Sequence, residues 1–205
     1  MSIDQKTALQ IRLAVAIALA DGEFSDFEKK TIKKWLQKKN EDMTESKKNK
    51  LLKELDLEFM KLEESKKSSQ LKLRQALRDI NSYDDRRLKY MAMDLAIEVM
   101  VADSKIHSKE VDLIDEIVAE LDLNAVTAKK YIHKQILNMD KSPINIDIEG
   151  LLNINPTVSN KVAKNLLQKE FVIWNSATTS STSTQQRENS QKMISFVSKC
   201  RERYA

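Results

Sequence analysis

The chain has 205 residues, of which 41% are hydrophobic and 32% are charged, so it can bury a sizeable core beneath a well-solvated surface. Its 35 basic and 31 acidic residues leave a net charge of +4, which is too even a balance to indicate nucleic acid or an acidic membrane as the partner. The single cysteine excludes an internal disulfide, and no apolar stretch is long enough to span a bilayer. With no signal-peptide pattern at the N-terminus, these features favour a cytoplasmic protein.

Only two glycines and two prolines interrupt the chain, which favours long helices over strands and turns. In chain order, the apolar periodicity predicts helices over residues 5–20, 26–40, 44–64, 69–80, 85–102, 108–121, 125–138, 158–175 and 185–203. The first and fifth of these each contain a stretch that is apolar on all sides, which is typical of a helix in the middle of a bundle. Residues 178–184 are all serine or threonine and predict a mobile loop.

The chain contains an internal repeat. A single shift aligns two segments without a gap, and the matched pairs are Leu13-Ala14 with Leu95-Ala96, Ala20-Asp21 with Ala102-Asp103, Glu28 with Glu110, and Ile32 with Ile114. Each unit, about 5–40 and 85–121, is an apolar helix, an Ala-Asp turn and an amphipathic helix, and two such units would pack about a pseudo-two-fold axis. The sequence therefore predicts an all-α fold, with a duplicated helical bundle over 1–138, a linker over 139–149 and a small helical hairpin over 150–205.

The turns of the two units carry a recognisable motif. Residues 20–28 read ADGEFSDFE and residues 102–110 read ADSKIHSKE, and together they resemble the paired signature of TerB-like domains, a family named for tellurite resistance. The second copy departs from the pattern with Ser104 for glycine and Lys105 for glutamate. The resemblance covers about residues 5–138. It implies an all-helical fold, a role in bacterial stress response or anti-phage defence, association with a metal, partner proteins from the same system and no catalytic activity.

The C-terminal part shows a second resemblance. Residues 151–156 read LLNINP and resemble the opening of a J-domain, which follows TerB-like domains in some membrane co-chaperones. The His-Pro-Asp tripeptide that a J-domain needs to stimulate its chaperone is absent from the chain, and the Ser/Thr stretch occupies its place. We therefore expect residues 150–205 to form a J-like docking hairpin without co-chaperone activity.

Acidic residues of the two turns form a candidate metal site. If the repeats pack symmetrically, five carboxylates could converge: Asp21, Glu23, Glu28, Asp103 and Glu110. Carboxylates alone favour calcium, magnesium or manganese, and His107 could add a nitrogen ligand. The alternative is structural, because Ser25 and Glu28 match a capping box, His107 and Glu110 occupy the same two places in the second copy, and aspartates can bind turn amides. Since caps explain every position, the fold requires no cofactor.

Two further features have a functional and a structural interpretation. The helix over 26–40 carries a basic run that is either a surface for nucleic acid or acidic protein or a solvated face, and it comprises Lys29, Lys30, Lys33, Lys34, Lys38 and Lys39. The solvated face is favoured because Trp35 shares an apolar stripe with Phe27, Ile32 and Leu36. Likewise, Phe171, Trp174 and Asn175 form either a recognition patch or part of the hairpin core.

His133 is expected on the surface and Cys200 in the packed interior. The leading hypothesis is a non-enzymatic module that binds other proteins. The alternative is a sensor or carrier of a divalent metal, and hydrolysis by the paired carboxylates ranks third.

Overall fold

The computed structural model describes residues 3–19, 24–64, 68–106 and 108–204, and ten helices account for most of them. The helices are α1 (Gln5–Ala18), α2 (Asp26–Lys39), α3 (Glu45–Glu64), α4 (Ser69–Asn81), α5 (Arg86–Met100), α6 (Ser108–Glu120), α7 (Ala125–Leu137), α8 (Ile148–Leu151), α9 (Asn160–Ser180) and α10 (Thr184–Glu202). Two short strands, β1 (Lys105–Ile106) and β2 (Asn145–Ile146), pair in parallel. The predicted all-α class and the C-terminal helix pair are confirmed.

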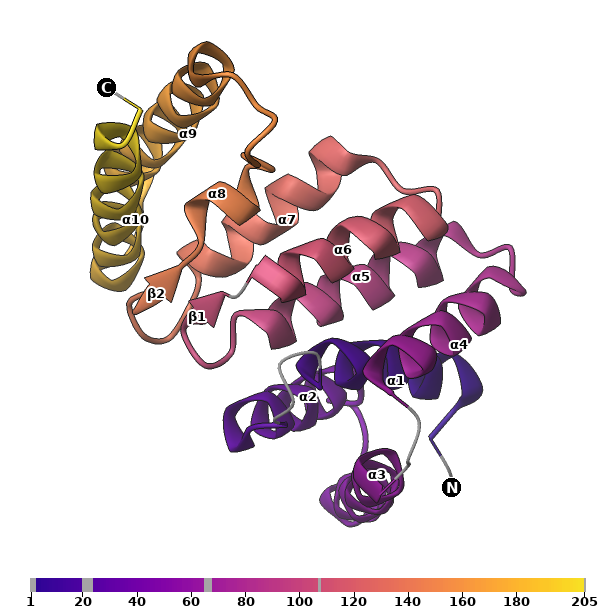
Figure 1. Cartoon of the computed structure of the whole chain (residues 1–205). Coiled ribbons are helices and arrows are strands. Elements are labelled where there is room, and N and C mark those ends of the chain that lie inside the picture. The colour runs from indigo at the N-terminus through magenta and orange to yellow at the C-terminus, as the bar shows by residue number, and fades with distance from the viewer. Residues whose placement is uncertain (1–2, 20–23, 65–67, 107, 205) are drawn as a thin grey trace.

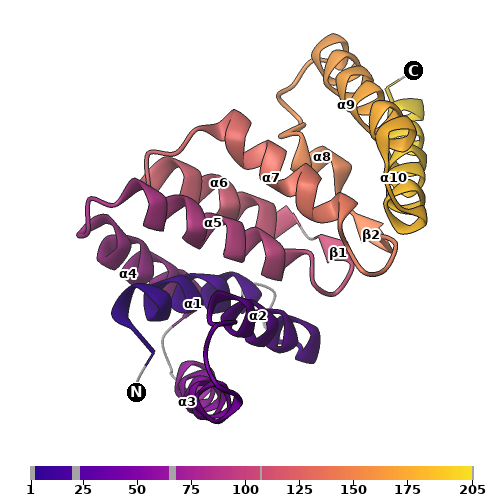
Figure 2. The ribbon, with the colours of Figure 1, turned by 180° about the vertical axis from the view of Figure 1, so that it is seen from behind.

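The helices are arranged in successive layers (Figure 1). Helices α1, α2 and α4 form one layer, α5 and α6 the next, then α7 with α8, and finally the antiparallel pair α9 and α10. The view from behind shows α3 at one end and the α9–α10 pair at the other, with the two termini also at opposite ends (Figure 2). The molecule is therefore an elongated stack in which each layer buries the apolar side of the one before it.

Helices α1 and α5 form the centre of the stack, and they make the most extensive helix contact of the described chain. Residues 13–18 of α1 are all buried, because α1 is apolar on every side and must be covered by neighbours all round. One hydrophobic cluster lies between α1, α4, α5 and the following layers, and a second lies between α1, α2, α3 and α5. The prediction that the two apolar helices pack together is confirmed.

Matched positions of the two repeats share the same environment. Leu13 and Leu95 are both buried, as are Ile32 and Ile114. In addition, α2 contacts α5 of the other unit and α6 contacts α1, which is the reciprocal arrangement that a two-fold axis produces. The turn over residues 20–23 lies outside the described residues, so the superposition of the two Ala-Asp turns stays a prediction.

The loop predicted over residues 178–184 is shorter than expected and comprises only residues 181–183. Helix α9 continues to Ser180, and α10 begins at Thr184 with Ser183 as its N-cap. The Thr178 hydroxyl donates to the Trp174 carbonyl at 3.0 Å, and the Ser180 hydroxyl donates to the Ser176 carbonyl at 3.0 Å. Hydroxyls that bond one turn back allow a Ser/Thr stretch to stay helical, so only three residues connect the two helices.

The hairpin packs directly on the bundle. Trp174, Met193 and Val197 are buried in the same hydrophobic cluster as residues of α1 and α5. The buried Asn189 amide of α10 donates to the carbonyls of Ile136, Leu137 and Met139 at 3.0 to 3.3 Å. Leu137 is the last residue of α7 and Met139 lies just beyond it, so Asn189 bonds backbone acceptors at the C-terminal end of the helix. Residues 139–149, predicted as a linker, contain β2 and the start of α8.

Candidate functional site

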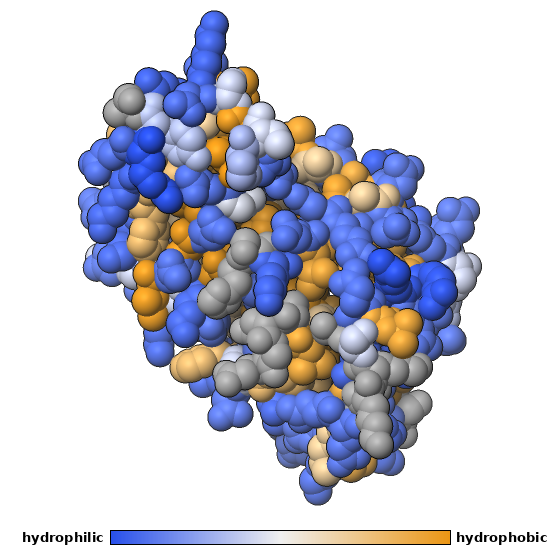
Figure 3. Space-filling view, viewed as in Figure 1, coloured by the Kyte–Doolittle hydropathy of each residue, from blue (hydrophilic) through white to orange (hydrophobic). Residues whose placement is uncertain are grey.

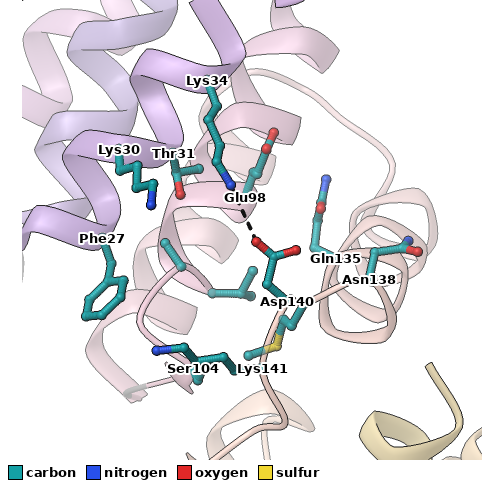
Figure 4. A pocket seen from close by; sticks show the side chains of 13 residues that line it. Phe27, Lys30, Thr31, Lys34, Glu98, Ser104, Gln135, Asn138, Asp140 and Lys141 are labelled. Atoms are coloured by element: carbon teal, nitrogen blue, oxygen red, sulfur yellow. Dashed lines mark hydrogen bonds and ion pairs between the residues drawn. The ribbon is translucent and has the colours of Figure 1, made fainter. Parts of the chain in front are cut away.

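A cavity of about 380 Å³ opens between α2, the end of α5 and the segment that follows α7. One wall consists of Phe27, Lys30, Thr31 and Lys34 of α2. The opposite wall consists of Gln135 of α7 and residues 138–141, and Glu98 lies between the two walls (Figure 4). Val101, Ala102 and Met139 add apolar surface to the lining. We call this cavity and its lysine rims the α5 groove.

The lysines of α2 divide between two surfaces. On one side, Lys29 pairs with Glu63 and Lys33 with Asp56, both on α3 and both at 2.7 Å. On the other side lie Lys30, Lys34 and Lys38, which are four residues apart and therefore share one face of the helix. Lys30, Lys34 and Lys38 face the α5 groove. The carboxylates of α3 therefore neutralise only the other side of the basic run.

The rims of the α5 groove are only partly neutralised. Lys34 lies 3.4 Å from Asp140, an exposed pair that contributes little stability (Figure 4). Lys30 and Lys38 make no ion pair with any described residue. From the opposite side, Lys141 lies 4.9 Å from the centroid of the Phe27 ring, a cation–π contact. Positive charge therefore lines both walls.

Glu98 is the acidic group on the floor of the groove. Burial raises the pKa of its carboxyl, and the neighbouring Asp94 raises it further, while Lys38, Lys134 and Lys34 oppose that shift. Asp94 accepts a hydrogen bond from Gln135 at 3.1 Å, whereas no described residue donates one to Glu98. The groove thus holds the half-buried Glu98 carboxylate between two basic walls, and this carboxylate can still accept hydrogen bonds that no described residue donates.

Phe27 is half exposed, which contradicts the prediction that it faces inward. The buried stripe of α2 is Glu28, Ile32 and Leu36. Phe27 precedes Ile32 by five residues and so lies about 140° around the helix from it. Trp35, which neighbours this stripe, is partly buried against the second hydrophobic cluster. The ring of Phe27 is left at the edge of the α5 groove.

The capping box predicted for the first repeat is confirmed. The Ser25 side chain accepts from the Glu28 amide at 3.3 Å, and the Glu28 carboxylate accepts from the Ser25 amide at 2.6 Å. In the second repeat, Asp103 accepts from the Lys105 amide at 2.9 Å, as expected for a turn aspartate. Ser104 has φ 68°, a left-handed conformation that its counterpart glycine adopts more easily.

The predicted metal site is only partly described by the structure. Asp21, Glu23 and His107 lie outside the described residues. Glu28 and Glu110 occupy equivalent positions and are both buried. Within the ranges that the structure describes, no group of three His, Cys, Asp or Glu side chains is arranged to hold a metal ion.

The residues predicted for a C-terminal patch have different environments. Trp174 is buried, and its indole donates to Glu170 at 2.7 Å. Phe171 is partly buried, with Arg201 5.0 Å from its ring centroid, and Asn175 is exposed. These positions agree with a core role for Trp174, and a recognition role for the patch stays a prediction.

Two single residues complete the comparison with the sequence. His133, expected on the surface, is instead largely covered and lies 2.8 Å from the buried Glu170 across the α7–α9 contact. Cys200 is buried as expected, and burial raises the pKa of its thiol.

The α5 groove was not predicted from the sequence, although part of its signal was present. Asp94 and Glu98 are four residues apart in the apolar second half of α5, so they must share one face. That spacing predicts an opening along α5, because two carboxylates are rarely buried without partners. The opposite wall comes from residues 135–141, and no local pattern places that segment beside α2.

Comparison with known proteins bears on the bundle. Residues 7–131 match the family model described as tellurite resistance protein TerB. A search of curated proteins and a search of solved structures gave no match. Along the described part of the chain, no helix has both the length and the apolar character needed to cross a membrane. The family match extends from α1 into α7 and includes both repeats, and on this ground the chain belongs to the TerB family.

Proposed function

We propose that this protein is a non-enzymatic module that binds other proteins through the α5 groove, within a stress-response or anti-phage defence system. The observation that carries the proposal is the groove itself, which combines a half-exposed aromatic ring with basic rims that the fold neutralises only in part. An exposed aromatic residue beside charged rims is typical of a protein-binding surface. On the face shown in Figure 3, hydrophobic side chains occur in small groups among hydrophilic ones.

The test is site-specific photo-crosslinking in the native host. A photoreactive phenylalanine analogue at position 27 should capture one or a few defined proteins when the cells are exposed to tellurite or phage. The matched control places the same analogue at position 126, where Val126 is 64% exposed at the start of α7 and outside the groove. Equal capture at both positions, or capture at neither, would contradict a binding role for the groove.

Binding of a divalent cation by the acidic turns is the second candidate function. It is favoured by the burial of two equivalent carboxylates, Glu28 and Glu110, beside the turns. A cation that binds only the folded state raises the melting temperature by mass action. Because Glu28 and Asp103 already accept backbone hydrogen bonds, we expect the same melting temperature with a chelator as with millimolar calcium, magnesium or manganese. A stabilisation by one ion that disappears in Asp103→Asn would instead establish the metal site.

For the hairpin over residues 150–205 we propose a docking role without co-chaperone activity. The chain has no His-Pro-Asp tripeptide, and the short connection between α9 and α10 leaves no long loop to display one. The full chain should therefore leave the ATPase rate of a heat-shock chaperone unchanged. A clear acceleration in a steady-state assay would refute this part of the proposal.

A further inference from the structure

We propose that the α5 groove receives an acidic peptide segment with an apolar side chain, presented by a partner protein. This inference rests on the proposed function, because it names the chemistry of the partner that binds the same groove. Three parts of the groove support it: the rims, the floor and the aromatic edge.

The rims require negative charge on the partner. Lys30 and Lys38 on the α2 side have no ion pair among the described residues, and Lys134 and Lys141 face them from the α7 side. The neighbouring lysines of α2, by contrast, are matched by carboxylates of α3. Lysines without an ion-pair partner therefore lie on both sides of the groove. They favour a ligand with carboxylates on both sides of its chain, since complementary charge steers the encounter of two molecules and fixes how they align.

The floor favours a peptide over a polynucleotide. Glu98 lies on the floor with Asp94 beside it, so the negative charges of a ligand must lie over the lysine rims and not over Glu98. Glu98 also has acceptor capacity that no described residue uses. A peptide main chain offers N–H donors to such a carboxylate, whereas the phosphate and sugar of a DNA backbone offer none.

The aromatic edge accounts for an apolar side chain on the partner. Phe27 is 51% exposed, and Val101, Ala102 and Met139 continue the apolar surface into the cavity. A volume of about 380 Å³ can hold one or two side chains. The expected segment therefore carries a leucine or phenylalanine flanked on both sides by aspartate or glutamate.

The experiment measures fluorescence anisotropy with the full chain and a labelled 12-residue peptide in which two pairs of aspartates flank Leu-Phe. The peptide should bind, and a version with asparagine in place of aspartate should bind at least about tenfold more weakly. The double substitution Lys30→Glu with Lys141→Glu should weaken binding of the acidic peptide by about tenfold. Phe27→Ala should weaken it by about threefold, and Glu98→Gln, which keeps an acceptor but removes the opposing charge, should strengthen it by about threefold.

The matched control is Lys161→Glu combined with Lys164→Glu, which makes the same change of net charge on exposed positions of α9. This control should leave binding unchanged, and melting curves should show that all variants fold. Equal losses in control and groove variants would overturn the proposal, as would tighter binding of a single-stranded oligonucleotide through Lys30 and Lys141. If the acidic peptide fails to bind while crosslinking at position 27 still captures a partner, the acidic segment is refuted and the interaction module stands.

Discussion

At the scale of single residues, the capping box at the start of α2 joins the first turn to the first amphipathic helix. Two backbone N–H groups that the helix cannot satisfy are bonded by Ser25 and Glu28. Ser25→Ala should lower the free energy of unfolding by about 1 kcal/mol. For a chain of this length that corresponds to a melting temperature lower by about 2–4 °C. Glu28→Gln should cost less, because glutamine can still accept from the Ser25 amide.

Calorimetric melts of the two variants check this prediction. Ser159→Ala, which removes the N-cap of α9, is the matched control for an ordinary cap. If both Ser25→Ala and Glu28→Gln melt like wild type while the control does not, the capping box contributes nothing to stability.

Glu98 gives a pH-dependent prediction. Its folded-state pKa is raised by burial above the ordinary value of 4.5, so its contribution to stability is fully present below about pH 4.5 and is lost as the pH rises through the folded pKa. Glu98→Gln removes the buried charge and should raise the melting temperature at pH 7 but not at pH 4. Melts at both pH values test the sign. The exposed control Glu188→Gln should shift the melting temperature at neither pH.

Residue-scale features were predictable where they are local. The capping box and the turn aspartate, Asp103, depend on partners two or three positions away, so their spacing in the sequence was sufficient. The exposure of Phe27 depends on its angle around α2 and was open to calculation from the spacing. The neighbours of Glu98 and Lys141 come from segments that are distant in the sequence, such as Lys34 for Glu98 and Phe27 for Lys141, and no pattern within one helix contains that information.

At the scale of elements, Asn189 links α10 to the end of α7. Asn189→Leu keeps the branching and the number of heavy atoms of the side chain but removes the donor to three carbonyls. A buried polar group that loses its partner costs about 1–3 kcal/mol, so the melting temperature should fall by about 2–12 °C. Asn175→Leu, at an exposed position of α9, is the control and should have little effect. An unchanged melting temperature for Asn189→Leu would show that water replaces the amide at no cost.

The starts of the long helices were predicted within a few residues where a Ser, Asp or Asn cap precedes them, as at Asp4, Ser25 and Asn124, whereas the short α8, capped by Asp147, was not predicted. Two elements show the limit of that method. The end of α9 was missed because serine and threonine are read as loop formers, although their hydroxyls can bond within a helix. The β1–β2 pair was missed because each strand has two residues and its partner is forty positions away.

At the scale of the whole molecule, the bundle and the hairpin share one hydrophobic cluster. A fragment of residues 1–138 would expose buried side chains of α6 and α7 that contact α8 and α10, so it should melt below the full chain. The full chain should unfold in a single calorimetric transition. A fragment that melts at the temperature of the full chain, or two separate transitions in the full chain, would instead show an independent bundle.

The contacts of Asn189 also have a consequence for synthesis on the ribosome. The Met139 carbonyl and the Asn189 amide that bonds it are separated by 50 positions in the chain. A chain emerges N-terminus first at about 5–20 residues per second. The Met139 carbonyl therefore emerges about 2.5–10 s before the Asn189 amide that bonds it. Throughout that interval, all of residues 7–131, which match the family model, have been synthesised, but α10 does not yet cover α7. A nascent chain at this stage leaves exposed the side of α7 that α10 covers in the folded protein.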